Sequence, residues 1–314
     1  MSKLLNAEPP VERPPVADDD ICGWRYKSIV GPNGTMTCEA IPLTKEDLLF
    51  PEEDDHIIYP SIHTRDFEYC HLSLGTLYRE EPRVAVLGDQ RVDFGVDWLR
   101  PLGPDILVLF DILRPLSEWE RIGTYRLADL GGRPILVIEI ASPSTYDNDL
   151  GIKKGFYYGL GVQVYVIVDR GPDGQAQTRL LGHQRGPQGW SPLPADAQGR
   201  LDLAPIPLRL GIENDRPWLY DAATGVRLPD LSEAVAGMKT AQAAARAAEA
   251  TACQEAEARE KAEAAVQSAE ATARREAEAR ANAEAQLRRE TEATAELQSR
   301  LRELEEKLRQ QGPG

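Results

Sequence analysis

Two acidic residues, Asp105 and Glu139, stand beside apolar runs where an ionised carboxylate is costly. Asp105 precedes the run ILVLF, and Glu139 lies inside the run PILVIEIA. If both runs are neighbouring strands, the two carboxylates lie near one edge of a sheet and can approach a common point. A divalent cation with oxygen ligands would then supply the countercharge that burial of Glu139 requires.

A lysine and two further polar residues follow Glu139 at helical spacing. After the turn sequence Ser-Pro-Ser-Thr, Asp149, Lys153 and Tyr157 are each four residues apart, so they share nearly one face of a helix. That face can point back to the strand end and bring an ammonium near the two carboxylates. Such an ammonium can orient an attacking water, help to deprotonate it or stabilise charge developing on phosphorus, while a metal polarises the phosphoryl group.

Each of these residues also has a purely structural interpretation. Asp105 can cap a turn, and Asp149 can stabilise a helix N-terminus through the helix dipole. Lys153 can be a solvated surface lysine, and Tyr157 can pack in the core with a hydrogen-bonded hydroxyl. The residue types alone leave both interpretations open.

The elements that must position these residues form an α+β pattern. Residues 61–78 place apolar side chains at helical spacing, and short apolar or alternating runs follow: RVAVLGD, RVDFGVDWL, DILVLFDI and PILVIEIA. A helix over residues 147–161, the buried strand VQVYVIVD and antiparallel β additions come next. The order helix, three strands, helix, strand predicts an α+β domain around a mixed sheet. Upstream, we expect a hairpin over the run GWRYKSIVGPNGTMTCEAIPLT. Thr44, at the end of this run, is expected to be the N-cap of a short helical turn.

Composition divides the chain into three parts. Residues 1–20 are rich in proline and contain three consecutive aspartates, so we expect a disordered tail. Residues 21–230 carry the mixed pattern of helices and strands. Residues 231–314 are dominated by Ala, Glu and Arg, which predicts a long helix or coiled coil.

The last part contains an internal repeat. The sequence AEATACQEAEAR at residues 248–259 returns as AEATARREAEAR at residues 269–280, three heptads later. Leucines at residues 297–308 form a coiled-coil seam, whereas the alanine-rich part of the seam is weaker. We expect self-association through residues 287–308, and the alternative is a single solvated helix.

Bulk properties exclude several other classes of protein. No apolar stretch reaches the roughly 18 residues of a membrane span, and the N-terminus lacks a secretory signal, so a cytoplasmic location is expected. The four cysteines are far apart and are expected to be reduced thiols, and no zinc-type His/Cys cluster occurs. The net charge of −15 opposes non-specific binding to nucleic acid.

The motifs GPDILVLF, PILVIEIASPST and GVQVYVIVD, together with Asp149, Lys153 and Tyr157, resemble the Uma-two family of restriction endonucleases, within the PD-(D/E)XK nuclease superfamily. The resemblance covers about residues 40–220. It implies a restriction-endonuclease-like core and an Mg²⁺- or Mn²⁺-dependent endonuclease that hydrolyses DNA phosphodiester bonds with a metal-activated water.

The resemblance also implies roles for particular residues. Asp105 and Glu139 would be the metal-binding acids, with the backbone carbonyl of Ile140 as a further ligand. The superfamily's lysine usually lies two residues after the second acid, where this chain has Ala141. This departure implies either an inactive site or a lysine relocated to the following helix, where Lys153 matches the family's recurrent lysine.

Supporting roles and partners follow from the same resemblance. His63 matches a family histidine that precedes the strands, and Asp149 and Tyr157 would support the site. The candidates for contact with DNA are Arg65, Arg79, Arg83, Arg91 and Arg100. One alternative to an active endonuclease is a catalytically inactive nuclease-fold module that assembles through its coiled coil. A further alternative is metal-dependent hydrolysis of RNA or nucleotides.

Overall fold

The computed structural model describes residues 22–31, 33–115, 118, 123–310 and 312. Contacts between residues divide the chain into two units, Met1–Ala234 and Val235–Gly314. The tail predicted for residues 1–20 lies outside the described residues. No helix in the described part of the chain is long and apolar enough to cross a membrane.

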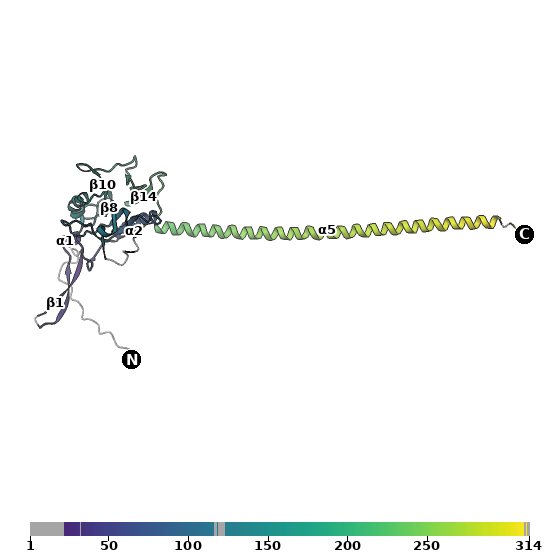
Figure 1. Ribbon diagram of the computed structural model, residues 1–314, viewed down its shortest axis with the longest axis horizontal. Coiled ribbons are helices and arrows are strands. Elements are labelled where there is room, and N and C mark those ends of the chain that lie inside the picture. Colours follow the sequence, from purple (N-terminus) through teal and green to yellow (C-terminus); the bar gives the residue numbers. More distant parts are fainter. Residues whose placement is uncertain (1–21, 32, 116–117, 119–122, 311, 313–314) are drawn as a thin grey trace. The chain divides into compact units, whose positions relative to one another are not determined.

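The first unit begins with a small antiparallel sheet in the strand order β2-β1-β3. It contains the predicted hairpin, which is formed by β1 (Gly23–Val30) and β2 (Met36–Pro42), and the short strand β3 (His56–Ile57) (Figure 1). The predicted helical turn α1 (Lys45–Leu49) follows β2. Its N-cap, Thr44, accepts a hydrogen bond from the backbone N–H of Asp47 at 3.2 Å, which ends the extended chain and starts the helix.

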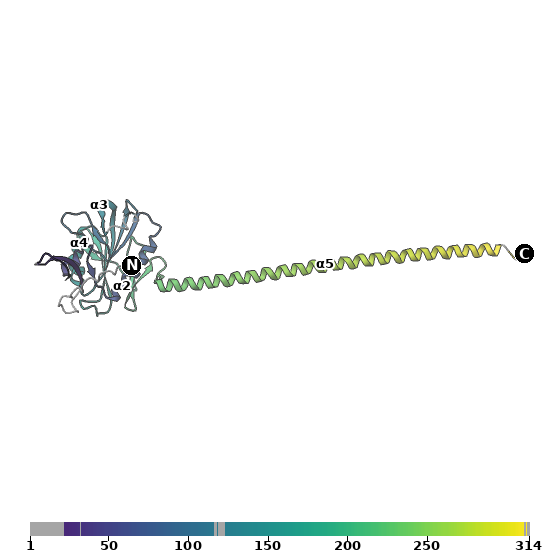
Figure 2. The same cartoon turned by 90° about the horizontal axis from the view of Figure 1, so that it is seen from below.

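A six-stranded sheet with the order β11-β10-β9-β8-β6-β4 forms the centre of the first unit (Figure 2). Its strands are β4 (Val84–Gly88), β6 (Ile106–Ile112), β8 (Gly131–Ile140), β9 (Val164–Asp169), β10 (Arg179–Gly186) and β11 (Gly189–Pro192). Strands β8 and β9 run parallel, and the other neighbouring pairs are antiparallel. This arrangement confirms the predicted α+β class with a mixed sheet.

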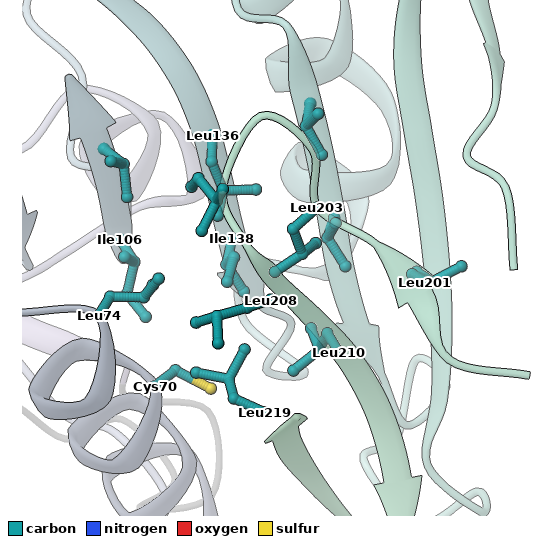
Figure 3. Packing of buried hydrophobic residues seen from close by; sticks show 14 of the residues in the cluster. Cys70, Leu74, Ile106, Leu136, Ile138, Leu201, Leu203, Leu208, Leu210 and Leu219 are labelled. Carbon is teal, nitrogen blue, oxygen red and sulfur yellow. The ribbon is translucent and has the colours of Figure 1, made fainter. Parts of the chain in front are cut away.

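Alternate residues of the central strands feed two separate cores, one on each face of the sheet. On the first face, Ile138 and Ile140 pack against helix α2 (Ser61–Leu77) and a second sheet. That sheet consists of β12 (Leu201–Asp202), β13 (Leu208–Glu213) and β14 (Arg216–Asp221). Figure 3 shows Leu74 of α2 and Leu208 and Leu219 of the second sheet gathered around Ile106 and Ile138.

The other face of the sheet is covered by the helix that follows β8. Val137 of β8 and Leu107 of β6 share this core with Tyr157 of α4 (Lys153–Gly159). Because side chains alternate along a strand, Glu139 must lie on the same face as Val137. The period of β8 therefore directs Glu139 toward α4.

The helix predicted over residues 147–161 is divided into two parts. Residues Asn148–Ile152 form a π-helical turn, η3, which continues directly into α4. The helix ends at Leu160, and Gly161 follows with φ of 84°, the left-handed conformation typical of a helix end.

The strand predicted for RVDFGVDWL is shorter than the run. Only Arg91–Asp93 is extended, as β5, and it pairs in parallel with β7 (Thr124–Arg126) in a two-stranded sheet separate from the central one. The backbone turns after Asp93, whose Oδ1 accepts the N–H of Gly95 at 2.9 Å, and Gly95 has φ of 72°. A short helix, α3 (Leu127–Leu130), then leads from β7 into β8.

A buried ion pair ties α2 to the end of β9. Asp66 is fully buried and accepts a hydrogen bond from Nη2 of Arg170, which is 3% exposed. Arg65 also binds Asp66 at 2.8 Å, and Arg216 lies 3.9 Å away. The cationic groups around Asp66 offset the cost of burying its charge.

The second unit is formed by most of the helix α5 (Leu231–Gln310), which has 80 residues (Figure 1). Every side chain described from residue 235 to residue 307 is exposed. The predicted long helix is therefore present. The coiled coil stays a prediction.

We expect Asp66→Asn to reduce the free energy of unfolding by about 3–5 kcal/mol, because Arg170 would stay buried without its carboxylate. Urea denaturation measures this loss. Arg83→Ala is the control, because it removes an exposed ion pair with Asp111 and should cost less than about 1 kcal/mol. Similar losses in both variants would contradict a special role for the buried pair.

Candidate active site

Asp105 and Glu139 lie side by side at one end of two antiparallel strands. The register pairs Ile106 with Ile138, so Asp105 precedes β6 just where β8 carries Glu139. The backbone N–H of Asp105 donates to Oε2 of Glu139 at 3.3 Å, and the N–H of Ile140 donates to Oδ2 of Asp105 at 2.6 Å. Each acid is thus held by the backbone of the strand that carries the other.

Lys153 joins these acids from α4. Its Nζ lies 3.1 Å from Oε1 of Glu139 and 2.8 Å from Oδ1 of Asp149, one turn earlier in the helix. The side chain is 3% exposed, so it does not point into solvent. The structure therefore brings together Glu139, Asp149 and Lys153, as the helical spacing suggested.

Two tyrosine hydroxyls hold the acids from the α4 side. Tyr157 donates to Oε1 of Glu139 at 2.6 Å, and Tyr165 of β9 donates to the backbone oxygen of Asp149 at 2.7 Å. Both rings are fully buried, with centroids 5.1 Å apart. Tyr165 was missed in the sequence, although a lone tyrosine within the aliphatic run VYVIVD is a signal for a buried hydroxyl with a polar partner.

His63 reaches the site from the start of α2. Its Nε2 lies 3.2 Å from Oδ2 of Asp105, and the ring of Tyr59 stacks on it at 4.3 Å between centroids. The Tyr59 hydroxyl donates to Oδ1 of Asp89 at 3.3 Å. Tyr59 lies in the loop before α2, and Asp89 directly follows β4, so no pattern in the sequence was a reason to join either residue to the site.

The three buried acids differ in how well their charge is compensated. Burial raises the pKa of Glu139 to about 8, and the charges of Asp105 and Asp149 add to this rise against the opposing effect of Lys153. Burial also raises the pKa of Asp149. Burial would raise the pKa of Asp105 as well, but the hydrogen bond and charge of His63, the charge of Lys153 and the N–H of Ile140 together outweigh burial and lower this pKa. Glu139 is therefore the acid whose charge most needs a further cation.

The two basic groups favour their protonated forms. Burial alone would lower the pKa of Lys153, but the carboxylates of Asp149 and Glu139 outweigh it and raise that pKa. The pKa of His63 is likewise raised, because Asp105 outweighs burial. Lys153 therefore acts as a positive charge in the site rather than as a proton acceptor, and the contact with Asp105 favours the protonated form of His63.

The donor set fits a hard divalent cation. When all three buried acids are ionised, their negative charges outnumber the positive charges of one ammonium and one imidazolium, and carboxylate oxygens are the ligands that Mg²⁺ and Mn²⁺ prefer. Among the described residues, no three His, Cys, Asp or Glu side chains form a complete metal cage. Such a cage is not required, because Mg²⁺ is commonly held by one or two carboxylates and keeps several waters.

The strand position next to the acids carries no lysine. Ala141 is buried with the apolar residues of the α4 face, and its backbone N–H donates to the carbonyl of Val168 at 3.0 Å. The ammonium of Lys153 enters instead from the neighbouring helix. The role predicted for the backbone carbonyl of Ile140 stays a prediction.

A cavity of about 470 Å³ opens onto the site. Asp105, Glu139 and Lys153 line it, so the acids are buried but reachable. Most other ionisable groups in the lining are acidic: Glu52, Glu53, Asp55 and Asp89, beside His56 and Arg91. The cavity therefore attracts cations more strongly than anions.

Of the arginines predicted to contact DNA, only Arg91 lines this cavity. It donates to Oγ1 of Thr124 at 2.7 Å and lies 4.0 Å from Glu53. Arg65 pairs with Asp66 and Arg83 pairs with Asp111, both outside the cavity lining, and Arg100 pairs with Glu46 and with Glu52 of the lining. These arginines therefore do not form a basic lining in the cavity that could contact DNA.

The sequence of the chain also matches a known protein family. Two acids at the adjoining ends of antiparallel strands, with a lysine beside them, are residues that can hold a divalent cation. The chain belongs to the Uma2 family, described as "Putative restriction endonuclease", whose profile matches residues 60–233. This confirms the family indicated by the sequence motifs.

A solved structure from Anabaena variabilis ATCC 29413, described as "a putative nuclease belonging to DUF820", is also similar to this chain. The two are 16% identical with a TM-score of 0.30, and the match covers 49% of this chain and 90% of that one. No curated protein matches this chain.

We expect the stability of the metal-free protein to fall between about pH 5 and about pH 8.5, partly through Glu139. An acid with a pKa raised from 4.5 to about 8 stabilises the fold below pH 4.5, and this contribution is lost as pH rises through about 8. The side chain of Glu139→Gln cannot ionise, so the unfolding free energy of this variant should decrease less over the same pH range. The decreases in the wild type and in the variant should differ by more than about 1.4 kcal/mol, the equivalent of one pKa unit. Urea titrations in EDTA measure both slopes, and equal slopes would contradict the raised pKa.

Proposed function

We propose that this protein is a divalent-metal-dependent endonuclease that hydrolyses phosphodiester bonds in DNA. The observation that carries the proposal is the convergence of Asp105, Glu139 and Lys153 within hydrogen-bonding and ion-pairing distances at the wall of a cavity. Membership of a family described as restriction endonucleases supports this class of reaction. DNA is the substrate that such a family implies.

Asp105 and Glu139 would hold the cation, with the backbone carbonyl of Ile140 as a further ligand. When bound, the cation supplies Lewis-acid polarisation of the phosphoryl group and favours ionisation of water. Glu139 must be ionised to serve as a ligand, and its raised pKa makes that ionisation dependent on the cation.

Lys153 acts through its fixed positive charge. The raised pKa of this group argues against proton abstraction by the amine and favours orientation of the reacting groups and stabilisation of charge on phosphorus. Its ion pairs with Glu139 and Asp149 hold the ammonium in place before a substrate arrives. Tyr157 and His63 position the two acids through the hydrogen bonds described above.

The acidic cavity imposes a condition on DNA binding. Glu52, Glu53, Asp55 and Asp89 would repel a phosphate backbone, so cations must neutralise part of this lining before DNA can approach. Divalent cations would therefore promote substrate binding as well as chemistry. The alternative, an inactive nuclease-fold module, predicts cation binding without cleavage.

We expect the protein to cleave supercoiled plasmid DNA with Mg²⁺ or Mn²⁺, and Glu139→Gln, Asp105→Asn and Lys153→Met to lower the rate by about 10²-fold or more. Lys154→Ala is the matched control, because Lys154 is the neighbouring, partly exposed lysine and should leave the rate unchanged. Thermal melting checks that each variant is folded. Equal rates in the Lys153 and Lys154 variants would overturn the assigned role of Lys153.

We expect Mg²⁺ or Mn²⁺ to raise the melting temperature of the wild-type protein, and to do so at lower concentration as pH rises from about 6 to about 8, because Glu139 must release a proton. Asp105→Asn should abolish this shift. Asp111→Asn, which changes an exposed acid on the same strand β6, should retain it. An equal shift in both variants would place the cation outside the proposed site.

A further inference from the structure

Helix α5 carries large apolar side chains that the described part of the chain leaves exposed to solvent. Seven of them are more than half exposed and share one face at heptad spacing: Leu231, Met238, Val266, Leu287, Leu297, Leu301 and Leu304. A single helix gains no stability from such a seam, because its apolar side chains stay in water. The seam therefore needs a second helix.

Charged residues occupy five inner positions of this seam. If Leu301 is assigned to heptad position a and Leu304 to position d, Glu255, Glu276 and Glu290 fall at d, and Arg259 and Arg280 fall at a. A charge at an a or d position is costly unless the facing helix supplies the opposite charge. The four charges that lie in the two copies of the internal repeat, at residues 255, 259, 276 and 280, therefore restrict which helix can bind and in which direction.

We propose that α5 pairs with α5 of a second copy of this chain in an antiparallel coiled coil, with Glu255 facing Arg280 of the second copy. In this register Arg259 faces Glu276 of the second copy, so the acids and arginines of the internal repeat have opposite charges across the seam, whereas Glu290 faces Ala245. The two-fold symmetry of the pair gives four such contacts. The proposal is independent of the nuclease activity.

The same register also matches apolar side chains by size. Met238 faces Leu297 of the second copy, and Leu287 faces Ala248. At the centre, Val266 faces Ala269. Large side chains opposite small or flexible ones allow two helices to pack closely without voids.

The pairing continues to the ends of the heptad pattern. Leu301 faces Ala234 of the second copy, and Leu304 faces Leu231, the first residue of α5. The exposed leucines at the C-terminal end of the helix therefore have partners as well. The seam is used along its whole length and is not restricted to residues 287–308.

Other arrangements leave the charges unmatched. A parallel pair in register sets each of the five charged residues against the same residue of the second copy, so like charges face each other in five layers. Moving the antiparallel pair by one heptad sets Glu255 against Ala273 or Leu287, which supply no countercharge. The internal repeat explains why one register is favoured, since its two copies carry the same Glu and Arg positions 21 residues apart.

The residues that flank the seam allow the two helices to approach. On one side, the positions next to the seam are small, such as Ala258, Ala265 and Thr272. On the other side, Glu263 and Glu270 of the two copies would face each other. These carboxylates are exposed, so their repulsion is weak and screened by salt, whereas the charges inside the seam are desolvated.

Cysteine crosslinking of the full chain tests the orientation. Ala252 and Ala283 face each other in the antiparallel pair but never face themselves. In a background with Cys253→Ser, we expect Ala252→Cys and Ala283→Cys to form a covalent dimer when the two proteins are mixed and oxidised, and neither to do so alone. A covalent dimer from either variant alone, or a monomer in light scattering of the wild-type protein, would overturn the proposal.

A charge exchange tests the register. We expect Glu255→Arg to weaken dimerisation about tenfold or more, and the addition of Arg280→Glu to restore it, because the double variant recreates an opposite pair. Glu257→Arg is the control, because it makes the same charge change away from the seam and should have little effect. Sedimentation equilibrium measures the affinities. Failure of the second change to restore affinity would contradict the register.

Discussion

The arrangement of the site depends on one buried ammonium, that of Lys153. Three carboxylates are removed from water within a few residues of the sheet edge, and burial of each charge would cost several kcal/mol without compensation. Lys153 binds two of them directly, and His63 binds the third. Two positive charges cannot compensate three ionised carboxylates, and the pKa of Glu139 is raised to about 8 as a result of its burial. Ionisation of Glu139 therefore favours the binding of a further cation, which makes the site suited to a metal ion.

Local structure delivers the groups to this point from four directions. β6 and β8 bring Asp105 and Glu139 as neighbours, η3 and α4 bring Asp149 and Lys153, and α2 brings His63. The strand following α4 runs parallel to β8, so the helix crosses back over the sheet and lies above the acids. Fixed polar groups of this kind lose little entropy when a ligand binds, because they are already in place.

Much of this arrangement could be predicted from the sequence because it depends on periodicity. The alternation in PILVIEIA and the four-residue spacing from Asp149 to Tyr157 are local patterns, and together they indicated which side chains meet. The parts that could not be predicted depend on the path of the chain between elements. Asp89 lies in a bend after β4. Only the first part of RVDFGVDWL forms a strand, because the backbone turns at Gly95. The acidic residues that line the cavity likewise come from separate segments of the chain, and no single sequence motif contains them all.

The alternation of β8 has a consequence for how this protein can change in evolution. Ile138 and Ile140 belong to one core, and Glu139 faces the other, so its position depends on the parity of the strand. Insertion or deletion of one residue between Leu136 and Glu139 would turn the carboxylate into the apolar core beneath α2 and send an isoleucine into the site. Substitutions of one apolar residue by another preserve parity and are mild by comparison. This strand can therefore accept changes of residue type while its length is fixed.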